Sequence, residues 1–137
     1  MKKIIALLAL TIFVSSCSLD DDSNDFTFEF VPIVSVEMPD TFMLNETHQI
    51  TLNYFRPSTC HGFFDVSFSR DSQLQRTVAV INTVANSADC TELTDELRDF
   101  TFDFSVVYTG TYTFRFWQGK DDNGEDLFLI IEVPVIE

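Results

Sequence analysis

The clearest pattern in the chain is an alternation of apolar and polar residues with a period of two. Phe100, Phe102 and Phe104 are separated by Thr101 and Asp103, so their side chains fall on one face of an extended strand. Similar patterns predict strands elsewhere, although residues 77–84 are apolar on both faces. The seven predicted strands cover residues 26–38, 48–54, 64–68, 77–84, 99–106, 112–116 and 127–135.

In the first predicted strand, Phe26, Phe28 and Phe30 share one parity, and we expect them to form its buried face. Pro32 lies inside this strand and removes a backbone donor, so the strand is expected at a sheet edge or broken. The last two strands are joined through Asn123 and Gly124, a pair typical of hairpins. Residues 89–98 carry the only helical pattern, because Asp89 and Glu92 have the spacing of a capping box.

Seven short strands suit a sandwich of two sheets. The run Gly110-Thr111-Tyr112-Thr113-Phe114 resembles the start of a late strand in bacterial immunoglobulin-like domains. The resemblance implies a single seven-stranded, antiparallel, immunoglobulin-like β-sandwich over residues 26–137. An up-and-down barrel of lipocalin type is the alternative, but that fold prefers eight strands and longer chains.

The first residues read as a targeting segment. Lys2 and Lys3 precede an apolar run at residues 4–14, which is shorter than the ~20 residues of a membrane-spanning helix. A basic start, a short apolar core and small residues predict a signal peptide at residues 1–16. The following run, Val14-Ser15-Ser16-Cys17, resembles the lipobox of bacterial lipoproteins, which implies cleavage before Cys17 and lipid attachment to it. An ordinary signal peptide is the alternative.

Residues 17–25 are predicted to form the lipidated Cys17 and an acidic linker. The segment Ser-Leu-Asp-Asp-Asp-Ser-Asn-Asp has little apolar surface to bury and repels itself. Acidic residues just after such a Cys resemble the export signal of Bacteroidota surface lipoproteins. The resemblance implies a lipid-anchored protein of the bacterial outer membrane, facing outward. A plain spacer, with the domain on the periplasmic side, is the alternative.

The charge of the chain and its lack of catalytic motifs exclude several classes of function. The chain has 8 Lys and Arg against 22 Asp and Glu, a formal charge of −14, which disfavours nucleic acid as a partner. The sequence contains no Gly-x-Ser-x-Gly, no phosphate-binding loop and no His-Glu-x-x-His. We therefore predict no catalytic residues, no cofactor and no enzymatic activity.

Cys60 and Cys90 remain if Cys17 carries lipid. An exported protein meets an oxidising compartment, so we predict a disulfide between them. This bridge would tie loops together rather than cross the core. Two alternatives stay open: a pair of free thiols, or a metal site of Cys60, His61 and Cys90, whose spacing matches no zinc signature.

Two surface features could bind a ligand. The turn before the last strand offers hard oxygen ligands for calcium, but it does not fit the EF-hand register, and acidic hairpin tips are commonly only solvated. We therefore predict no metal site, with weak calcium candidates at Asp121, Asp122, Asn123, Glu125 and Asp126.

Trp117 has the parity of Arg115, opposite to Tyr112, Phe114 and Phe116, and should face outward. It could stack on a sugar ring or contact Arg115 by a cation–π interaction, or it could simply cover the end of the sheet.

The sequence therefore favours a lipid-anchored, non-enzymatic module for binding or assembly at the cell surface. The alternative is an accessory glycan-binding lipoprotein that serves polysaccharide uptake. An exposed aromatic side chain beside Trp117 would favour the glycan-binding alternative.

Overall fold

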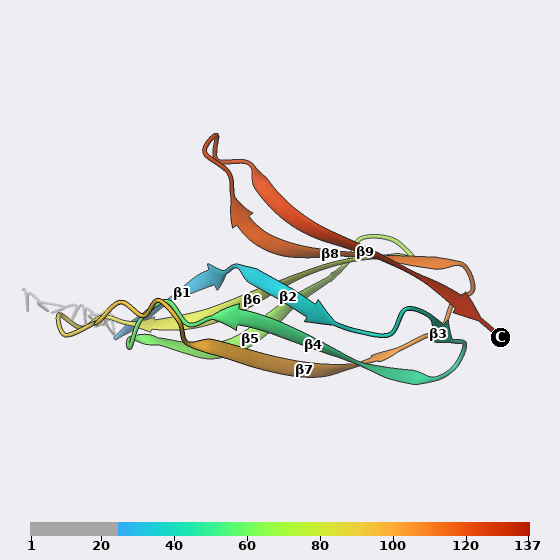
Figure 1. Ribbon diagram of the computed structural model, residues 1–137, viewed down its shortest axis with the longest axis horizontal. Helices are drawn as coiled ribbons and strands as arrows, with labels where there is room; N and C mark the ends of the chain where they lie inside the picture. Colours follow the sequence, from blue (N-terminus) through green and yellow to red (C-terminus); the bar gives the residue numbers. More distant parts are fainter. Residues whose placement is uncertain (1–24) are drawn as a thin grey trace, which may run out of the picture.

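The structure is a computed structural model that describes residues 25–137 (Figure 1). The predicted signal peptide, Cys17 and the acidic segment up to Asn24 lie outside the described residues. The described part is all-β, with no helix and nine strands. These are β1 (Phe26–Val31), β2 (Ile33–Glu37), β3 (Phe42–Met43), β4 (Thr47–Phe55), β5 (His61–Arg70), β6 (Gln75–Ala85), β7 (Leu97–Ser105), β8 (Thr111–Lys120) and β9 (Asp126–Ile136).

The strands form two sheets arranged as a sandwich, which confirms the predicted architecture (Figure 1). One sheet has three strands in the order β2-β4-β7. In the six-stranded sheet, β6 is central, and β5 pairs with one of its edges. β1 and β8 pair with different parts of the length of β6. The sheet continues from β8 to β9 and then to β3.

The predicted count of seven strands and the all-antiparallel pairing were wrong. Pro32 has no N–H to donate, and the first predicted strand divides there into β1 in one sheet and β2 in the other. The short strand β3 adds the ninth, parallel to β9. β8 runs parallel to β6 along residues 75–78, whereas β1 pairs with residues 80–85 of β6 in the antiparallel sense.

β1 and β8 approach each other end to end along β6. β1 pairs with residues 80–85 of β6, and β8 pairs with residues 75–78. Gly119, with φ of +98°, lies against Pro32, whose Cγ is 3.3 Å from where a Cβ would stand. This backbone conformation favours glycine. The register of β8 and β9 shifts between Trp117 and Lys120, and the hairpin bends away from the body of the sandwich (Figure 1).

Aromatic rings fill the centre of the core between the sheets. Tyr112, Phe114 and Phe116 on β8 are fully buried. Phe104 of β7 meets the rings of Tyr112 and Phe114 at centroid distances of 5.2 Å each. Phe102 is partly buried against the same cluster, while Asp103 between them is exposed. The alternation along the fifth predicted strand is therefore confirmed.

The expected burial of the first strand was wrong. Phe26, Phe28 and Phe30 are 43%, 56% and 52% exposed, whereas Val31 and Ile33, of the other parity, are each 1% exposed. Alternation shows only that side chains share a face of a strand, because both faces of a sheet have the same period of two. Here the phenylalanines lie on the outer face of the six-stranded sheet, which the second sheet does not cover.

In the third predicted strand, too, the burial of the side chains differs from the expectation. A bulge between Phe63 and Asp65 shifts the register of β5 against β6. Phe63 therefore stacks on Phe100 of the other sheet, at 4.5 Å between centroids. Phe64, expected inside, is 54% exposed and contacts Phe28 instead, at 4.7 Å.

The helix expected at residues 89–98 is absent from the described chain. β7 begins at Leu97, and the preceding loop is tied to the segment before β5. Thr59 N donates to Thr91 O at 3.0 Å, and Leu93 N donates to Pro57 O at 2.9 Å. These long-range backbone bonds satisfy groups that a helix would have paired locally, so tertiary contacts override the weak capping signal.

Candidate functional site: an aromatic groove

A groove of about 360 Å³ opens on the outer face of the six-stranded sheet, where β1 and β8 meet. Aromatic rings from three strands form its apolar part, and short hydroxyl side chains with one carboxylate and one ammonium form its polar part. The lining residues are Phe30, Ser67, Thr77, Ala79, Trp117, Lys120, Asp126 and Phe128. The volume lies within the range of small-molecule sites.

Three rings define the apolar part of this groove. The ring of Phe30 lies 5.9 Å from that of Trp117, with 59° between the planes. Phe128 pairs with Trp117 across β8 and β9. Phe30 is 52% exposed, so an exposed aromatic side chain does lie beside Trp117. The sequence pointed to Trp117 but missed Phe30 and Phe128, because neither lies near Trp117 in the chain and Phe30 was placed inside.

Arg115 does not contact Trp117 as a cation–π partner. Its guanidinium lies 4.1 Å from the ring centroid of Phe128, on the strand that pairs with β8. Arg115 has its cross-strand neighbour in Ile130, and Trp117 has its own in Phe128. The diagonal contact between Arg115 and Phe128 is the one that long side chains make across paired strands.

Asp126 organises the polar side of the groove. The indole Nε1 of Trp117 donates to Asp126 Oδ1 at 3.0 Å, and Lys120 Nζ lies 2.9 Å from the same oxygen. The hydrogen bond from Trp117, followed by that from Lys120, lowers the pKa of Asp126 below its ordinary value. The carboxylate is therefore ionised at neutral pH and holds the indole in place. Such a groove suits a ligand with an apolar face and a hydroxyl-rich edge.

The weak calcium candidates serve the hairpin itself. Asp121 Oδ1 accepts hydrogen bonds from the backbone N–H of Asn123 at 2.8 Å and of Glu125 at 2.9 Å. Asp126 is held by Trp117 and Lys120, and Asp122 is exposed at the tip. Across residues 25–137 no group of three His, Cys, Asp or Glu side chains is placed to hold a metal ion.

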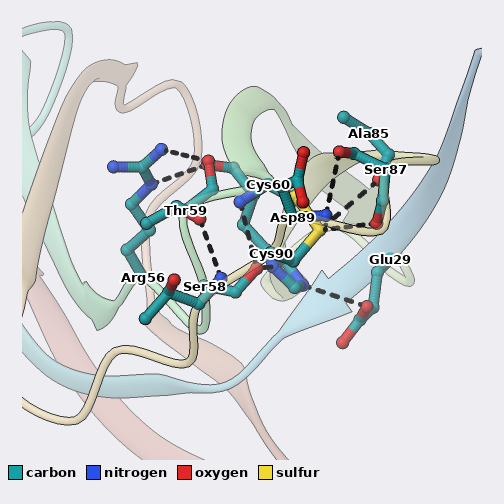
Figure 2. The surroundings of a disulfide bond; sticks show 11 residues. Glu29, Arg56, Ser58, Thr59, Cys60, Ala85, Ser87, Asp89 and Cys90 are labelled. Atoms are coloured by element: carbon teal, nitrogen blue, oxygen red, sulfur yellow. Dashed lines mark hydrogen bonds and ion pairs between the residues drawn. A yellow bond between two sulfur atoms is a disulfide. The ribbon is translucent and has the colours of Figure 1, made fainter.

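Cys60 and Cys90 form the predicted disulfide (Figure 2). It lies at the opposite end of β1 from the groove, because Cys60 O accepts the N–H of Ala85, the partner of Phe26 in β1. Their Cα atoms are 5.4 Å apart. The bridge joins the segment before β5 to the loop before β7, so it ties loops as expected. With the two sulfurs bonded to each other, the alternatives of free thiols and of a metal site at this pair no longer apply.

Polar side chains converge beside the disulfide, with Arg56, Ser58 and Glu29 around it (Figure 2). Ser58 Oγ lies 2.6 Å from His61 Nδ1, and His61 Nε2 lies 3.1 Å from Glu29 Oε2. Ser58 Oγ also accepts the N–H of Cys60 at 3.1 Å. Ser58 and His61 are buried, at 8% and 9% exposure. This chain of hydrogen bonds holds the disulfide loop against β1.

A second cavity, of about 400 Å³, opens between the two sheets at this end, beside Tyr54, Arg56 and Arg98. Burial raises the pKa of Tyr54, so its phenol stays neutral. Arg56 donates to His61 O at 2.6 Å and Thr59 O at 2.9 Å. Both guanidinium groups also contact Glu96. The cations of this cavity are therefore engaged by the protein, and the aromatic groove is the stronger candidate site.

Comparison with protein-family models, with curated proteins and with solved structures finds no match to this chain. No helix in the described part is long and apolar enough to cross a membrane.

Proposed function

We propose that the chain is a lipid-anchored lipoprotein of the bacterial outer membrane, whose β-sandwich is a non-enzymatic binding or assembly module at the cell surface. The observation that carries this proposal is the groove of Phe30, Trp117 and Phe128 on the uncovered face of the six-stranded sheet. Large exposed aromatic side chains gathered on one face are typical of interaction sites. The lipobox-like run ending at Cys17 supports the anchor.

A glycan is the ligand that this groove favours, which makes an accessory lipoprotein of a polysaccharide-uptake system the second candidate function. The apolar C–H face of a pyranose ring packs on an aromatic ring, while its hydroxyl groups need hydrogen-bonding partners at the edge. Phe30 and Phe128 beside Trp117 provide the rings. Asp126, held ionised, provides a charge-assisted acceptor next to them.

We also propose a relationship to immunoglobulin-like domains. Tyr112, near the start of β8, accepts hydrogen bonds at its hydroxyl from the backbone N–H of Val107 and Tyr108, at 3.4 and 3.2 Å. A tyrosine that bonds back across the corner before its strand is typical of such domains. The three-stranded sheet β2-β4-β7 also supports the relationship, whereas the parallel pairing of β6 with β8 departs from it.

The single Trp of the chain provides a direct test of glycan binding. The acylated protein in detergent micelles is titrated with soluble neutral polysaccharides, namely glucans, mannans and xylans, and Trp117 emission is recorded. We expect saturable changes in emission with at least one of them, and calorimetry should show that Phe128→Ala weakens the binding.

Phe55→Ala is the matched control, since Phe55 is 42% exposed on β4 of the other sheet, and it should bind like the parent. Failure of every polysaccharide to bind the folded protein would remove the glycan-binding candidate. The broader proposal of a binding module would then depend on a protein partner.

A further inference from the structure

The groove is one end of a longer aromatic stripe on the same sheet face. We use "aromatic stripe" for the outward rings of Phe26, Phe28, Phe64, Phe30, Trp117 and Phe128. Three pairs of its rings are in contact, with centroid distances of 5.5 Å for Phe26 and Phe28, 4.7 Å for Phe28 and Phe64, and 5.9 Å for Phe30 and Trp117. A hollow of about 180 Å³ lies between Phe28, Phe30 and Phe64. It shares Phe30 with the groove.

The stripe is exposed although the domain has a complete core without it. Its four phenylalanines on β1 and β5 are 43–56% exposed, while Val31 supplies the buried position of β1 at 1% exposure. Exposing several contiguous aromatic side chains is unfavourable in water and marks an interaction surface. The stripe is therefore a candidate interaction surface that extends beyond the groove.

The length of the stripe indicates an extended partner. Phe26 pairs with Ala85 of β6, and Trp117 follows Phe116, which pairs with Val78, so Trp117 lies level with Ala79 of the same strand. At the rise of a β-strand, these six residues of β6 separate the two rings by about 20 Å. A small ligand in the groove would contact Phe30, Trp117 and Phe128 but would leave Phe26, Phe28 and Phe64 in water.

Charge decides between the candidate partners. The chain carries a formal charge of −14, which repels anionic lipid headgroups, sulfated or uronate polymers and a second copy of itself. Within the groove, Lys120 is paired with Asp126 at 2.9 Å, and Glu29 lines the neighbouring hollow. Glu29 is engaged by His61 at 3.1 Å, so the charged groups beside the stripe have partners within the protein, which favours an uncharged partner over an anionic or a cationic one.

The ring orientations indicate a single chain rather than a flat surface. Neighbouring rings are inclined by 84° between Phe26 and Phe28, 56° between Phe28 and Phe64, and 59° between Phe30 and Trp117. Rings inclined in this way cannot all stack on one plane, as a crystalline polymer would require. A flexible chain can turn its successive units to meet each ring in turn.

We infer that the aromatic stripe binds one extended chain of an uncharged polysaccharide, from Phe26 beside β6 to Phe128 on β9. This inference rests on the proposed glycan-binding function and names its substrate class. It predicts that affinity depends on chain length, because only a long chain reaches both the groove and the far end of the stripe.

A length series tests the inference. Oligosaccharides from disaccharide to octasaccharide, prepared from the neutral polysaccharide that binds best, are titrated into the acylated protein in micelles by calorimetry. We expect affinity to rise about tenfold or more from the shortest to the longest. Phe28→Ala should lower the affinity for the octasaccharide about three- to tenfold and leave that for the disaccharide unchanged. Phe55→Ala should change neither, and circular dichroism checks that both variants are folded.

Several outcomes would overturn the inference. Equal affinity at all lengths, with no effect of Phe28→Ala, would confine the ligand to the groove and leave the glycan-binding function intact. Preference for a crystalline polymer over its soluble chain would exclude a single-chain site. Dimerisation or vesicle binding that Phe28→Ala abolishes would assign the stripe to another partner. Failure of all neutral glycans to bind would remove the inference together with the glycan-binding function.

Discussion

The ring of Phe30 lies 5.9 Å from the ring of Trp117, at the point where β1 and β8 meet along β6. Two contacts between the end of β8 and the turn between β1 and β2 hold this junction together. Gln118 Nε2 donates to the carbonyl of Ile33 at 3.1 Å, and Gly119 packs on Pro32. The turn that moves the chain from one sheet to the other therefore also places the aromatic ring that completes the groove.

Acidification should release the indole of Trp117 from Asp126. Hydrogen bonds from Trp117 and Lys120 lower the pKa of Asp126. The stabilisation they provide is therefore present above the ordinary aspartate pKa and is lost as pH falls through the lower folded value. Because Trp117 is the single Trp, its emission should change in that acidic window. Asp126→Asn should lack this transition, and Asp122→Asn, at the exposed tip, should retain it. The same transition in Asp126→Asn would show that another group titrates.

Phe104 and Asp103 should differ sharply in their effect on stability. Phe104 is 6% exposed among the rings of Tyr112 and Phe114, so Phe104→Ala should lower the free energy of unfolding by about 3–5 kcal/mol. Asp103→Ala removes an exposed side chain and should change it by less than about 0.5 kcal/mol. Urea denaturation of the oxidised protein measures both. Equal losses would contradict the assignment of faces on β7.

Asn82→Leu should stabilise the protein. Asn82 is 0% exposed on β6, and neither atom of its amide has a hydrogen-bond partner among the described residues. A buried, unpaired polar group costs about 1–3 kcal/mol, and leucine has the same branched side-chain skeleton as asparagine, with larger terminal groups. We expect a gain of about 1 kcal/mol or more in the free energy of unfolding. Asn53→Leu, on the outer side of β4, should give no such gain. A loss of stability in Asn82→Leu would contradict the assignment of Asn82 as a destabilising unpaired group.

Removing the disulfide should destabilise the domain without changing the core. Cys60 and Cys90 are 30 residues apart in sequence, and closing a loop of this size stabilises by about 3–4 kcal/mol in the chain-entropy model. The double variant Cys60→Ser with Cys90→Ser should therefore melt at a lower temperature, measured by circular dichroism. A reducing agent should lower the melting temperature of the parent to that of the variant. An effect of the reductant on the double variant would point to chemistry elsewhere.

If the chain is a lipoprotein, Cys17 is the residue that carries the lipid. Cys17→Ser should abolish fatty-acid labelling, because the lipobox-like run leads only to this thiol.

Replacing Asp20, Asp21 and Asp22 with Ser should leave labelling intact but protect the domain from protease added to whole cells. The same shaving of parent and triple variant would reduce the acidic run to a spacer. Protection of the unmutated protein until lysis would place the domain on the periplasmic side.

The sequence by itself determined the features that depend on local spacing or on counting. The alternation along Phe100, Phe102 and Phe104 predicted a strand and its inward face correctly. Asn123 and Gly124 predicted the last hairpin, which forms between β8 and β9. Two cysteines left after Cys17 predicted the Cys60–Cys90 bridge. Each of these depends on a few neighbouring residues or on a single pairing, so no knowledge of the packed arrangement is needed.

Only the tertiary structure decided which faces are covered. The alternation at Phe26, Phe28 and Phe30 is as clear as that on β7, yet these rings lie outside, because no second sheet covers that face. The capping-box spacing of Asp89 and Glu92 was overridden by backbone bonds to the segment before β5. The groove itself brings together residues from five strands, including β1 and β8, which lie far apart in the sequence. The period of two shows which side chains share a face of a strand. Which face is buried, and which residues meet in the groove, depends on the elements that pack against that strand.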